Sequence, residues 1–408
     1  MAQTWLVNER MLARARKADA LTRPFLPLIR AIFPPHAAVS RPPKRILVSE
    51  LWHIGDVVIA MPFLAALRQL FPDAAITLLS KSHAGVTLAN TGLVDEVVSF
   101  DFPWTFLDHD RKPALRELFQ IPSVVRQLRR SRFDLAFDCS RDGRNHFLMF
   151  LTGAARRVGF AFGGGEFFLT DAVPVGSLDL HRTEDWLRLL EPVAADRDDR
   201  PARRGGRVEP REALLVVSPD ERKRARELLG RAGHREGETL VAVHPGGSSH
   251  LKRWPVENFE ALARIAAEEY GARILWIVDP SGTGSDAGLP PDSIVARPSL
   301  RELIGLLGES DLLVSNDGGP MHLAAALGKP TFAIYSWGKP EWWKPYGSAA
   351  HAWVQRQDIT CRPCAGHCVF SEPICLTGLS LPAVAAAFRG MVATIPRAPS
   401  PKFSAAPG

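Results

Sequence analysis

The sequence lacks long apolar runs and any strong excess of one charge sign, and each absence excludes a class of protein. No stretch approaches the roughly 20 apolar residues needed to span a bilayer. Trp5–Val7 is followed at once by Asn8, Glu9 and Arg10, which does not match a secretory signal. The formal net charge of +6 over 408 residues suits an acidic ligand or an anionic surface, but not a dedicated nucleic-acid binder. We therefore expect a cytoplasmic protein with no nucleic-acid partner.

Cysteine is also scarce. Of the five cysteines, Cys139 stands alone and Cys361, Cys364, Cys368 and Cys375 crowd near the C-terminus. In a cytosolic chain such a cluster is not a disulfide framework. The intervals of two, three and six residues could hold zinc or iron through thiolates, or the same residues could pack as small hydrophobes in a buried tail.

The length predicts two domains, because 408 residues exceed one ordinary hydrophobic core. Apolar residues make up 46% and charged residues 23%, which is the balance of a soluble globular protein. Composition and pattern predict a basic N-terminal extension (1–44), a first αβα domain (45–205), a second αβα domain (206–380), a terminal helix (381–395) and a disordered tail (396–408).

The N-terminal extension combines basic and apolar residues at helical spacing. Arg10, Arg14, Arg16 and Lys17 alternate with apolar side chains, and a second apolar segment spans 25–33 before two prolines. The extension is either a helix lying on anionic lipid or an arm packed over its own domain.

From Arg45 onward, short apolar runs alternate with helical segments. This alternation predicts a parallel sheet with helices on both faces, once in each half of the chain. Ser218 and Ser299, each followed three residues later by glutamate, predict two helix starts. The predicted strands are Ile46–Val48, Ile76–Leu79, Val97–Phe100, Leu135–Phe137, Leu240–Val243, Ile274–Val278, Leu312–Ser315 and Thr331–Tyr335.

The first candidate for chemistry is Asp56, just past the carboxyl end of the first predicted strand. Ligands of open α/β sheets bind at that edge, so a carboxylate there is a candidate site residue. Asp56 could instead cap the following helix. Pro62 would kink a helix that began at Asp56, so the helix could begin near Met61 and leave Asp56 on a loop.

The second candidate is the segment His244–Pro255. It leaves a strand, supplies two glycines and the hydroxyls of Ser248 and Ser249, and then places Lys252 and Arg253 before a helix. Glycines allow close backbone approach, hydroxyls and amides bind phosphate oxygens, and lysine adds a positive charge. A flexible loop with solvated basic residues is the alternative.

The third candidate is Ser315–His322, between a strand and a helix of small residues. Glycines at the start of a helix expose its free amides, and the helix dipole favours an anion there. The segment is neither a GxGxxG fingerprint nor a Walker A loop, which disfavours a dehydrogenase or a P-loop enzyme. Taken alone, Asp317 could be a helix cap and His322 a core histidine. Together, the three segments suit group transfer from a nucleotide diphosphate.

At these residues the sequence resembles glycosyltransferase family 9, the ADP-heptose:lipopolysaccharide heptosyltransferases. The resemblance covers roughly 45–380, and its last stretch is the most specific. The matching stretches are Arg45–Val48, Gly55–Val58 with Pro62, Ala74–Leu79, Val94–Val97, His244–Gly246, Lys252–Pro255, Ser299–Leu306 and Asn316–Pro330.

The resemblance implies a GT-B fold, with two Rossmann-like αβα domains facing each other across a cleft. It implies an inverting transfer without an obligatory metal or other cofactor. The first domain would hold the acceptor, and Asp56 matches the family's proposed general base. The second would bind the nucleotide sugar, and Lys252 matches the lysine that neutralises the departing phosphate.

The resemblance also assigns donor-binding roles. Ser248 and Ser249 sit where family members place hydroxyls on the donor phosphates. Asp317 resembles the sugar-binding acid, and Gly318, Gly319 and His322 fall in the diphosphate-binding turn. The implied partners are a nucleotide-sugar donor such as ADP-heptose and a lipid-linked glycan acceptor, with peripheral contact at the inner face of the cytoplasmic membrane.

The sequence departs from the family at one place. Many members carry an acidic ribose-binding residue after the strand that corresponds to Ile274–Val278, and no glutamate occupies that place here. Asp279 or Asp286 could substitute. A sugar-nucleotide epimerase and a non-catalytic nucleotide-sugar-binding scaffold are the two alternative functions.

Overall fold

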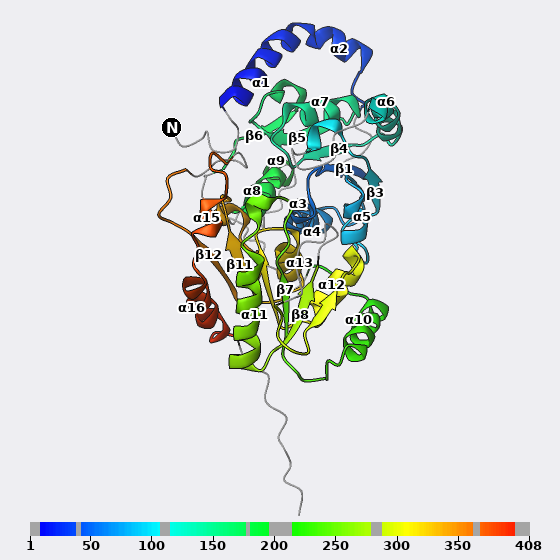
Figure 1. The fold of residues 1–408 in the computed structure, drawn as a ribbon. Helices are drawn as coiled ribbons and strands as arrows, with labels where there is room; N and C mark the ends of the chain where they lie inside the picture. Colours follow the sequence, from blue (N-terminus) through cyan, green and yellow to red (C-terminus); the bar gives the residue numbers. More distant parts are fainter. Residues whose placement is uncertain are drawn as a thin grey trace, which may run out of the picture. The chain divides into compact units, whose positions relative to one another are not determined.

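The computed structural model contains two α/β units, as the sequence predicts (Figure 1). It describes residues 9–37, 42–106, 115–176, 180–195, 214–278, 288–361 and 368–395. Contacts divide the chain into Met1–Val216 with Glu341–Trp343, and Val217–Pro340 with Lys344–Gly408. The expected boundary at 205/206, the charged segment before it and the tail from 396 lie outside the described residues.

The first unit is built on a six-stranded sheet in the order β3-β2-β1-β4-β5-β6, and every strand pair in it is parallel. Ile46 of β1 pairs with Ile76 of β2 and Leu135 of β4, so β1 lies in the centre and its apolar side chains are buried on both faces. The strands are β1 (Arg45–Ser49), β2 (Ala75–Ser80), β3 (Glu96–Ser99), β4 (Leu135–Asp138), β5 (Arg156–Phe160) and β6 (Asp171–Val173).

Helices cover this sheet, and two more form the N-terminal arm. Phe63 of α4 meets Phe137 of β4 edge-on, with ring centroids 5.4 Å apart, which packs that helix on the sheet centre. The helices are α1 (Glu9–Thr22), α2 (Leu26–Ile32), α3 (Ile54–Ile59), α4 (Met61–Leu70), α5 (His83–Thr87), α6 (Leu115–Arg130), α7 (Gly143–Leu151), α8 (Arg182–Leu187) and α9 (Glu191–Ala195).

The second unit is also built on a six-stranded sheet, in the order β12-β11-β10-β7-β8-β9, and every strand pair in it is parallel. Its strands are β7 (Leu240–His244), β8 (Arg273–Ile277), β9 (Ile294–Ala296), β10 (Leu312–Asn316), β11 (Thr331–Tyr335) and β12 (His351–Gln355). Its helices are α10 (Pro219–Arg231), α11 (Val256–Tyr270), α12 (Leu300–Glu309), α13 (Gly319–Ala326), α15 (Ile374–Thr377) and α16 (Leu381–Val392). Helix α14 (Pro340–Trp343) belongs to the first unit apart from its first residue.

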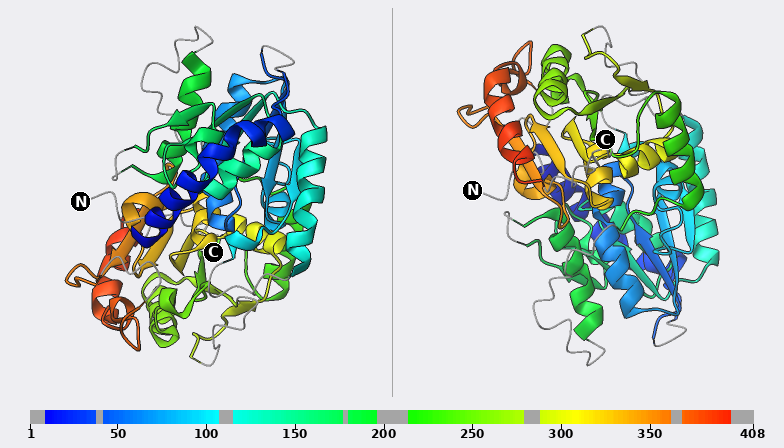
Figure 2. Two further views of the ribbon diagram at one scale, coloured as in Figure 1. Left: turned by 90° about the horizontal axis from the view of Figure 1, so that it is seen from above. Right: turned by 90° about the horizontal axis from the view of Figure 1, so that it is seen from below.

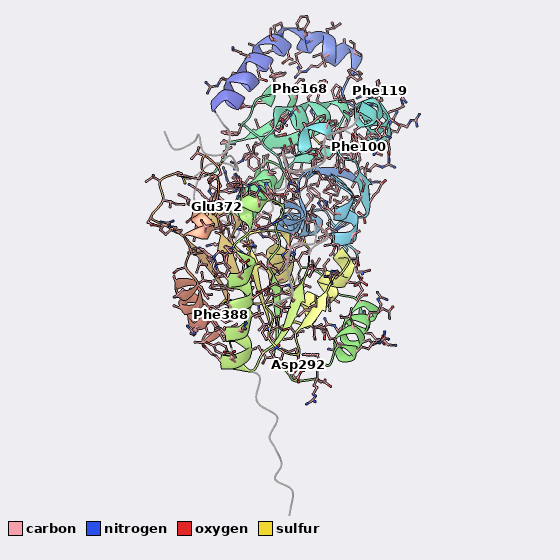
Figure 3. All side chains as sticks on the ribbon, viewed as in Figure 1. Phe100, Phe119, Phe168, Asp292, Glu372 and Phe388 are labelled. Atoms are coloured by element: carbon pink, nitrogen blue, oxygen red, sulfur yellow. The ribbon has the colours of Figure 1, made fainter. Side chains whose placement is uncertain are left out.

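The terminal helix α16 belongs to the core of the second unit. It lies beside α11 on one face of the sheet (Figure 2), and the Phe388 ring meets Phe332 of β11 at 5.6 Å and Tyr270 of α11 at 6.2 Å (Figure 3). Both rings meet it nearly edge-on, a favourable aromatic arrangement. The C-terminal helix therefore closes the hydrophobic core over this face.

Both sheets reverse their strand order beside their first strand. In the first unit β1 lies between β2 and β4, and in the second β7 lies between β8 and β10. Ligands of open parallel sheets bind outside the carboxyl ends of the strands at such a reversal. The segments that follow β1, β4, β7 and β10 are therefore the places to look for a site.

The two predicted capping boxes are confirmed. Ser218 accepts from the amide of Glu221 at 3.3 Å, and the Glu221 carboxylate accepts from the Ser218 amide at 2.8 Å. Ser299 and Glu302 form the same pattern at the start of α12.

We expect Ser218→Ala to lower the free energy of unfolding by about 1 kcal/mol, because the Glu221 amide loses its partner at the helix end. Chemical denaturation monitored by circular dichroism measures the change. Ser348→Ala, at an exposed position in a bend, is the matched control and should leave stability unchanged. Equal unfolding curves for the two variants would contradict the assignment of the cap.

Candidate active site

The predicted site residues fall at the two strand-order reversals. Asp56 follows β1 in the first unit. In the second unit, Ser248, Ser249 and Lys252 follow β7, and Asp317, Gly318, Gly319 and His322 follow β10. Because β7 and β10 pair in parallel, the segments after them begin side by side, with His244 opposite Ser315.

Asp56 lies in a short helix and not on a loop, which corrects one of the two sequence interpretations. Its carboxylate accepts from the His53 amide at 3.0 Å as part of a capping box at the start of α3. The expected helix start at Met61 is confirmed, because the chain turns at Ala60 and begins α4 with Pro62 in its first turn. Asp56 thus completes a capping box and is also a partly exposed carboxylate at the carboxyl edge of the sheet.

A buried carboxyl group lies next to Asp56. Glu50, the residue after β1, is 1% exposed, and one of its carboxylate oxygens accepts from the Trp52 amide at 3.1 Å. Burial, and then the negative charges of Asp56 and Asp138, raise the pKa of Glu50 well above its ordinary value. At this edge Glu50 therefore favours the neutral acid, which limits the repulsion that Asp56 experiences.

A buried carboxylate–imidazole pair ends the neighbouring strand β4. Asp138 Oδ2 lies 3.3 Å from His146 Nε2, and both side chains are fully buried. Burial raises the pKa of Asp138, and the His146 charge and the Ser140 amide offset part of that rise. The pair anchors α7 to the carboxyl end of β4, because His146 lies on α7.

Two arginines supply positive charge on the same side of the first unit. Arg182 and Arg141 both contact the buried carboxylate of Asp185, with Arg182 Nη1 at 3.2 Å from Asp185 Oδ2. Burial, and then the nearby Arg141 charge, lower the pKa of Arg182 to about 10, while the charges of Asp185 and Asp56 raise it. Arg188 Nη1 also lies 3.6 Å from Asp185 Oδ1. Three cations therefore share one carboxylate, and the group keeps a net positive charge close to Asp56.

In the second unit Lys252 and Asp317 form an ion pair. Lys252 Nζ lies 3.2 Å from Asp317 Oδ2 and 5.3 Å from the centroid of the Trp337 ring. Asp317 is almost fully buried, whereas Lys252 is about a quarter exposed. The carboxylate and the ring therefore fix the ammonium group while one side of it stays accessible. Gly338 permits this packing, because a Cβ there would lie 3.0 Å from Asp317 Oδ2.

Asn316 ties the two segments of the second unit together. Its side-chain amide donates to the carbonyls of Pro245 at 2.7 Å and Gly246 at 3.0 Å, and its oxygen accepts from the Trp254 amide at 3.1 Å. One buried side chain thus closes the loop that carries Ser248, Ser249 and Lys252. Ser248 is exposed at the loop tip, and the Ser249 oxygen accepts from the Leu251 amide at 3.2 Å.

The segment after β10 presents the N-terminus of α13. Gly318 is the N-cap and Gly319 the first helical residue, so amides of the first turn lack partners within the helix. His322 is buried, and burial lowers its pKa to about 4. The Asp317 charge raises this pKa, whereas the Lys252 charge lowers it. His322 is therefore neutral at physiological pH, and within the described residues its Nδ1 has no hydrogen-bond partner.

Sequence reasoning missed several residues of these groups. Asn316 lies in the most specific motif, and its position after a buried strand was a signal that could have identified it. Glu50 follows the first apolar run and offered the same signal. No sequence signal identified Arg141, Arg182 or Trp337. Only the fold brings the two arginines to Asp185 and the Trp337 ring to Lys252.

The sequence left open whether the four clustered cysteines hold a metal. One of them, Cys364, lies outside the described residues, in 362–367. Across the described ranges, no group of three or more histidine, cysteine or acidic residues could hold a metal ion. Over those same ranges no helix is both long and apolar enough to cross a membrane.

The two sheets with the 3-2-1-4-5-6 order define a two-domain α/β protein of the nucleotide-binding type. The family model for glycosyltransferase family 9 (heptosyltransferase) matches residues 121–371. The chain belongs to this family and is a glycosyltransferase, as the sequence resemblance predicts.

Similar proteins agree with this assignment. The lipopolysaccharide core heptosyltransferase OpsX of Haemophilus influenzae is 20% identical over 317 residues, covering 75% of this chain and 83% of that protein. The crystal structure of a family 9 glycosyltransferase from Veillonella parvula superposes with a TM-score of 0.70 at 21% identity, covering 86% of this chain and 97% of that one. E. coli heptosyltransferase WaaC, solved with ADP, gives 0.59 at 16% identity and covers 86% and 99%. The predicted GT-B fold class is confirmed.

We expect Asn316→Ala to destabilise the protein by about 2–4 kcal/mol, because it leaves buried carbonyls and a buried amide without partners. Thermal and chemical unfolding measure the loss. Asn258→Ala, a half-buried position on α11, is the control and should change stability far less. A loss no larger than that of the control would show that Asn316 does not hold the loop.

The raised pKa of Glu50 predicts a pH-dependent contribution to stability. The folded protein keeps a proton that the unfolded chain releases above about pH 4.3, so stability falls as pH rises from there to the folded pKa. Glu50→Gln mimics the protonated acid and removes this dependence. Its unfolding free energy relative to the wild type should therefore increase with pH, measured by denaturation from about pH 4.5 to about pH 8. Parallel pH curves for the two proteins would contradict the raised pKa.

Proposed function

We propose that the protein transfers a heptose or a related sugar from ADP-heptose to a lipopolysaccharide-core-type acceptor, with inversion at the anomeric carbon. The attacking acceptor oxygen forms a bond to that carbon as the bond from carbon to phosphate oxygen breaks. The nucleotide diphosphate leaves with the bonding electron pair, and the acceptor proton passes to Asp56.

The observation that carries the proposal is the ion pair of Lys252 with Asp317 beside the start of α13. A diphosphate leaving group gains negative charge as the bond breaks, and preorganised donors stabilise that charge without a metal. Lys252 supplies the ammonium group, and the first-turn amides of α13 supply dipoles. Asp317 would be shared between holding Lys252 and binding the donor sugar. Ser248 and Ser249 would bind the phosphates.

The acceptor side rests on Asp56 and its neighbours. A general base must be ionised and must be reachable by the acceptor hydroxyl. The positive charge of Arg182 attracts the Asp56 carboxylate, and the raised pKa of Glu50 reduces the negative charge beside it. Within the first unit Asp56 is therefore the carboxylate best suited to accept a proton.

The identity of the donor rests on relatives. E. coli heptosyltransferase WaaC has been solved with ADP and with ADP-2-deoxy-2-fluoro heptose, which supports an adenine nucleotide donor here. The expected ribose contact, Asp279 or Asp286, lies outside the described residues. OpsX is named for the lipopolysaccharide core, which supports a lipopolysaccharide-core acceptor here. The proposal places the transfer in the cytoplasm at the inner membrane face.

Calorimetric titration of the purified protein with ADP, UDP and GDP and their sugars tests the donor. We expect ADP-heptose to bind at least about tenfold more tightly than the UDP and GDP sugars, a difference of about 1.4 kcal/mol. Lys252→Met should weaken ADP-heptose binding, since the diphosphate loses its ammonium partner. A preference for UDP sugars would overturn the proposed donor.

Transfer to a heptose-free core acceptor tests the base. Asp56→Asn keeps an oxygen for the His53 amide but cannot accept a proton, so kcat should fall about 10²–10⁴-fold with donor affinity unchanged. Asp73→Asn, an exposed position in the same unit, is the control. Full activity of Asp56→Asn would remove Asp56 from the mechanism. An altered sugar nucleotide without glycoside would indicate an epimerase, and donor binding without turnover a scaffold.

A further inference from the structure

The N-terminal arm, residues 9–37, exposes a row of large apolar side chains. Leu21, Phe25, Leu28 and Ile32 are 71%, 61%, 59% and 61% exposed. The backbone is helical from α1 through the short 3₁₀ turn Arg23–Phe25 into α2. Steps of four, three and four residues therefore place these side chains on one helix face. We call these four residues the apolar row.

The arm lies in the N-terminal segment that carries the charge imbalance of the whole protein. Residues 1–44 contain eight lysines and arginines and two acidic residues, a net charge of +6 that equals the formal net charge of the entire chain. The remaining 364 residues are therefore balanced. Arg16, Arg23 and Arg30 recur every seven residues and are exposed, so they form a second row on the polar side of the arm.

The arm is attached to the first unit and is not a free tail. Asp19 accepts from the Gly165 amide at 2.9 Å, and the His36 amide donates to the Gly153 carbonyl at 2.8 Å. Arg129 at the end of α6 donates to the Pro34 carbonyl at 2.5 Å. In Figure 1 the two helices lie beyond α7 at the outside of the unit. The arm thus contacts its own domain and still leaves the apolar row open to solvent.

We propose that the apolar row inserts into the interface of an anionic lipid bilayer, with the arginine row at the depth of the headgroups. A helix with one apolar face and basic residues on the other binds a membrane surface through burial of the apolar face and attraction to anionic lipid. A second copy of the chain fits this surface less well, because it would bring two arms of like charge together. The inference extends beyond the proposed reaction, since binding to lipid requires neither donor nor acceptor.

A second exposed apolar site lies on the same unit. Phe119 of α6 is 80% exposed and its neighbour Leu118 is 50% exposed (Figure 3). Arg116 and Arg126 of the same helix are also exposed. The first unit therefore offers an additional apolar and basic element to the membrane, which the arm variants leave intact.

Co-sedimentation of the full-length protein with vesicles tests the proposal. Vesicles of phosphatidylcholine alone are compared with vesicles that also contain phosphatidylglycerol. We expect partitioning to be at least about tenfold stronger on the anionic vesicles and to weaken with added salt. Phe25→Ser with Leu28→Ser should reduce it at least about tenfold. Val369→Ser, an exposed apolar position outside the arm, is the matched control and should bind as the wild type does.

A charge variant separates the electrostatic part. Arg16→Gln, Arg23→Gln and Arg30→Gln together should lower binding to anionic vesicles at least about tenfold and leave the weak binding to neutral vesicles unchanged. Lys223→Gln, Arg224→Gln and Arg231→Gln on α10 remove the same charge elsewhere and serve as the control. Circular dichroism checks that each variant folds.

Three results would overturn the proposal. They are equal partitioning into neutral and anionic vesicles, wild-type binding by the Phe25 and Leu28 variant, or a wild-type dimer that this variant converts to a monomer in analytical ultracentrifugation. The last result would assign the apolar row to a second copy. Calorimetry of ADP-heptose with the same variants should give the wild-type affinity, so failure at the membrane is distinguishable from failure of the proposed reaction.

Discussion

The parallel pairing of β7 with β10 is the constraint on which the donor half of the site depends. Parallel strands end at one edge of a sheet, so the segments that follow them start as neighbours. Asn316 uses this proximity to bind the loop after β7, and the Lys252–Asp317 ion pair joins the two segments a second time. The ammonium group is therefore positioned by the sheet and not by the loop alone, which is how a glycine-containing loop can hold a cation in place.

In the first unit burial changes the pKa of the acidic groups, whereas in the second unit an ion pair positions the charged groups. Glu50 and Asp138 are buried carboxyl groups at the ends of adjacent parallel strands, and each has a raised pKa because of that burial. Arg182 and Arg141 balance the charge through Asp185. Asp56 remains as a more accessible carboxylate between these groups. Asp56 is therefore the group suited to proton transfer, whereas Glu50 and Asp138 have structural roles.

Much of the fold was predictable from the sequence, because apolar runs and helix caps are local signals. The eight predicted strands and both capping boxes are present. Strands β5, β6, β9 and β12 were missed, since their partners determine them more than their own composition does. Asp56 shows the same limit at the site: the sequence left open whether it caps a helix, and its bond from the His53 amide shows that it completes a capping box.

The sequence by itself determined the class of protein and the chemical groups, because motif, spacing and strand-end position are written in the order of residues. Only the tertiary structure decided which groups meet. The 3-2-1-4-5-6 order brings Asn316 to Pro245 across 71 positions of the chain and Lys252 to Asp317 across 65. It also decided that the arm keeps its apolar row exposed while Asp19 and His36 hold it to the domain. Contacts between distant residues depend on sheet order and on burial, and no local pattern encodes either.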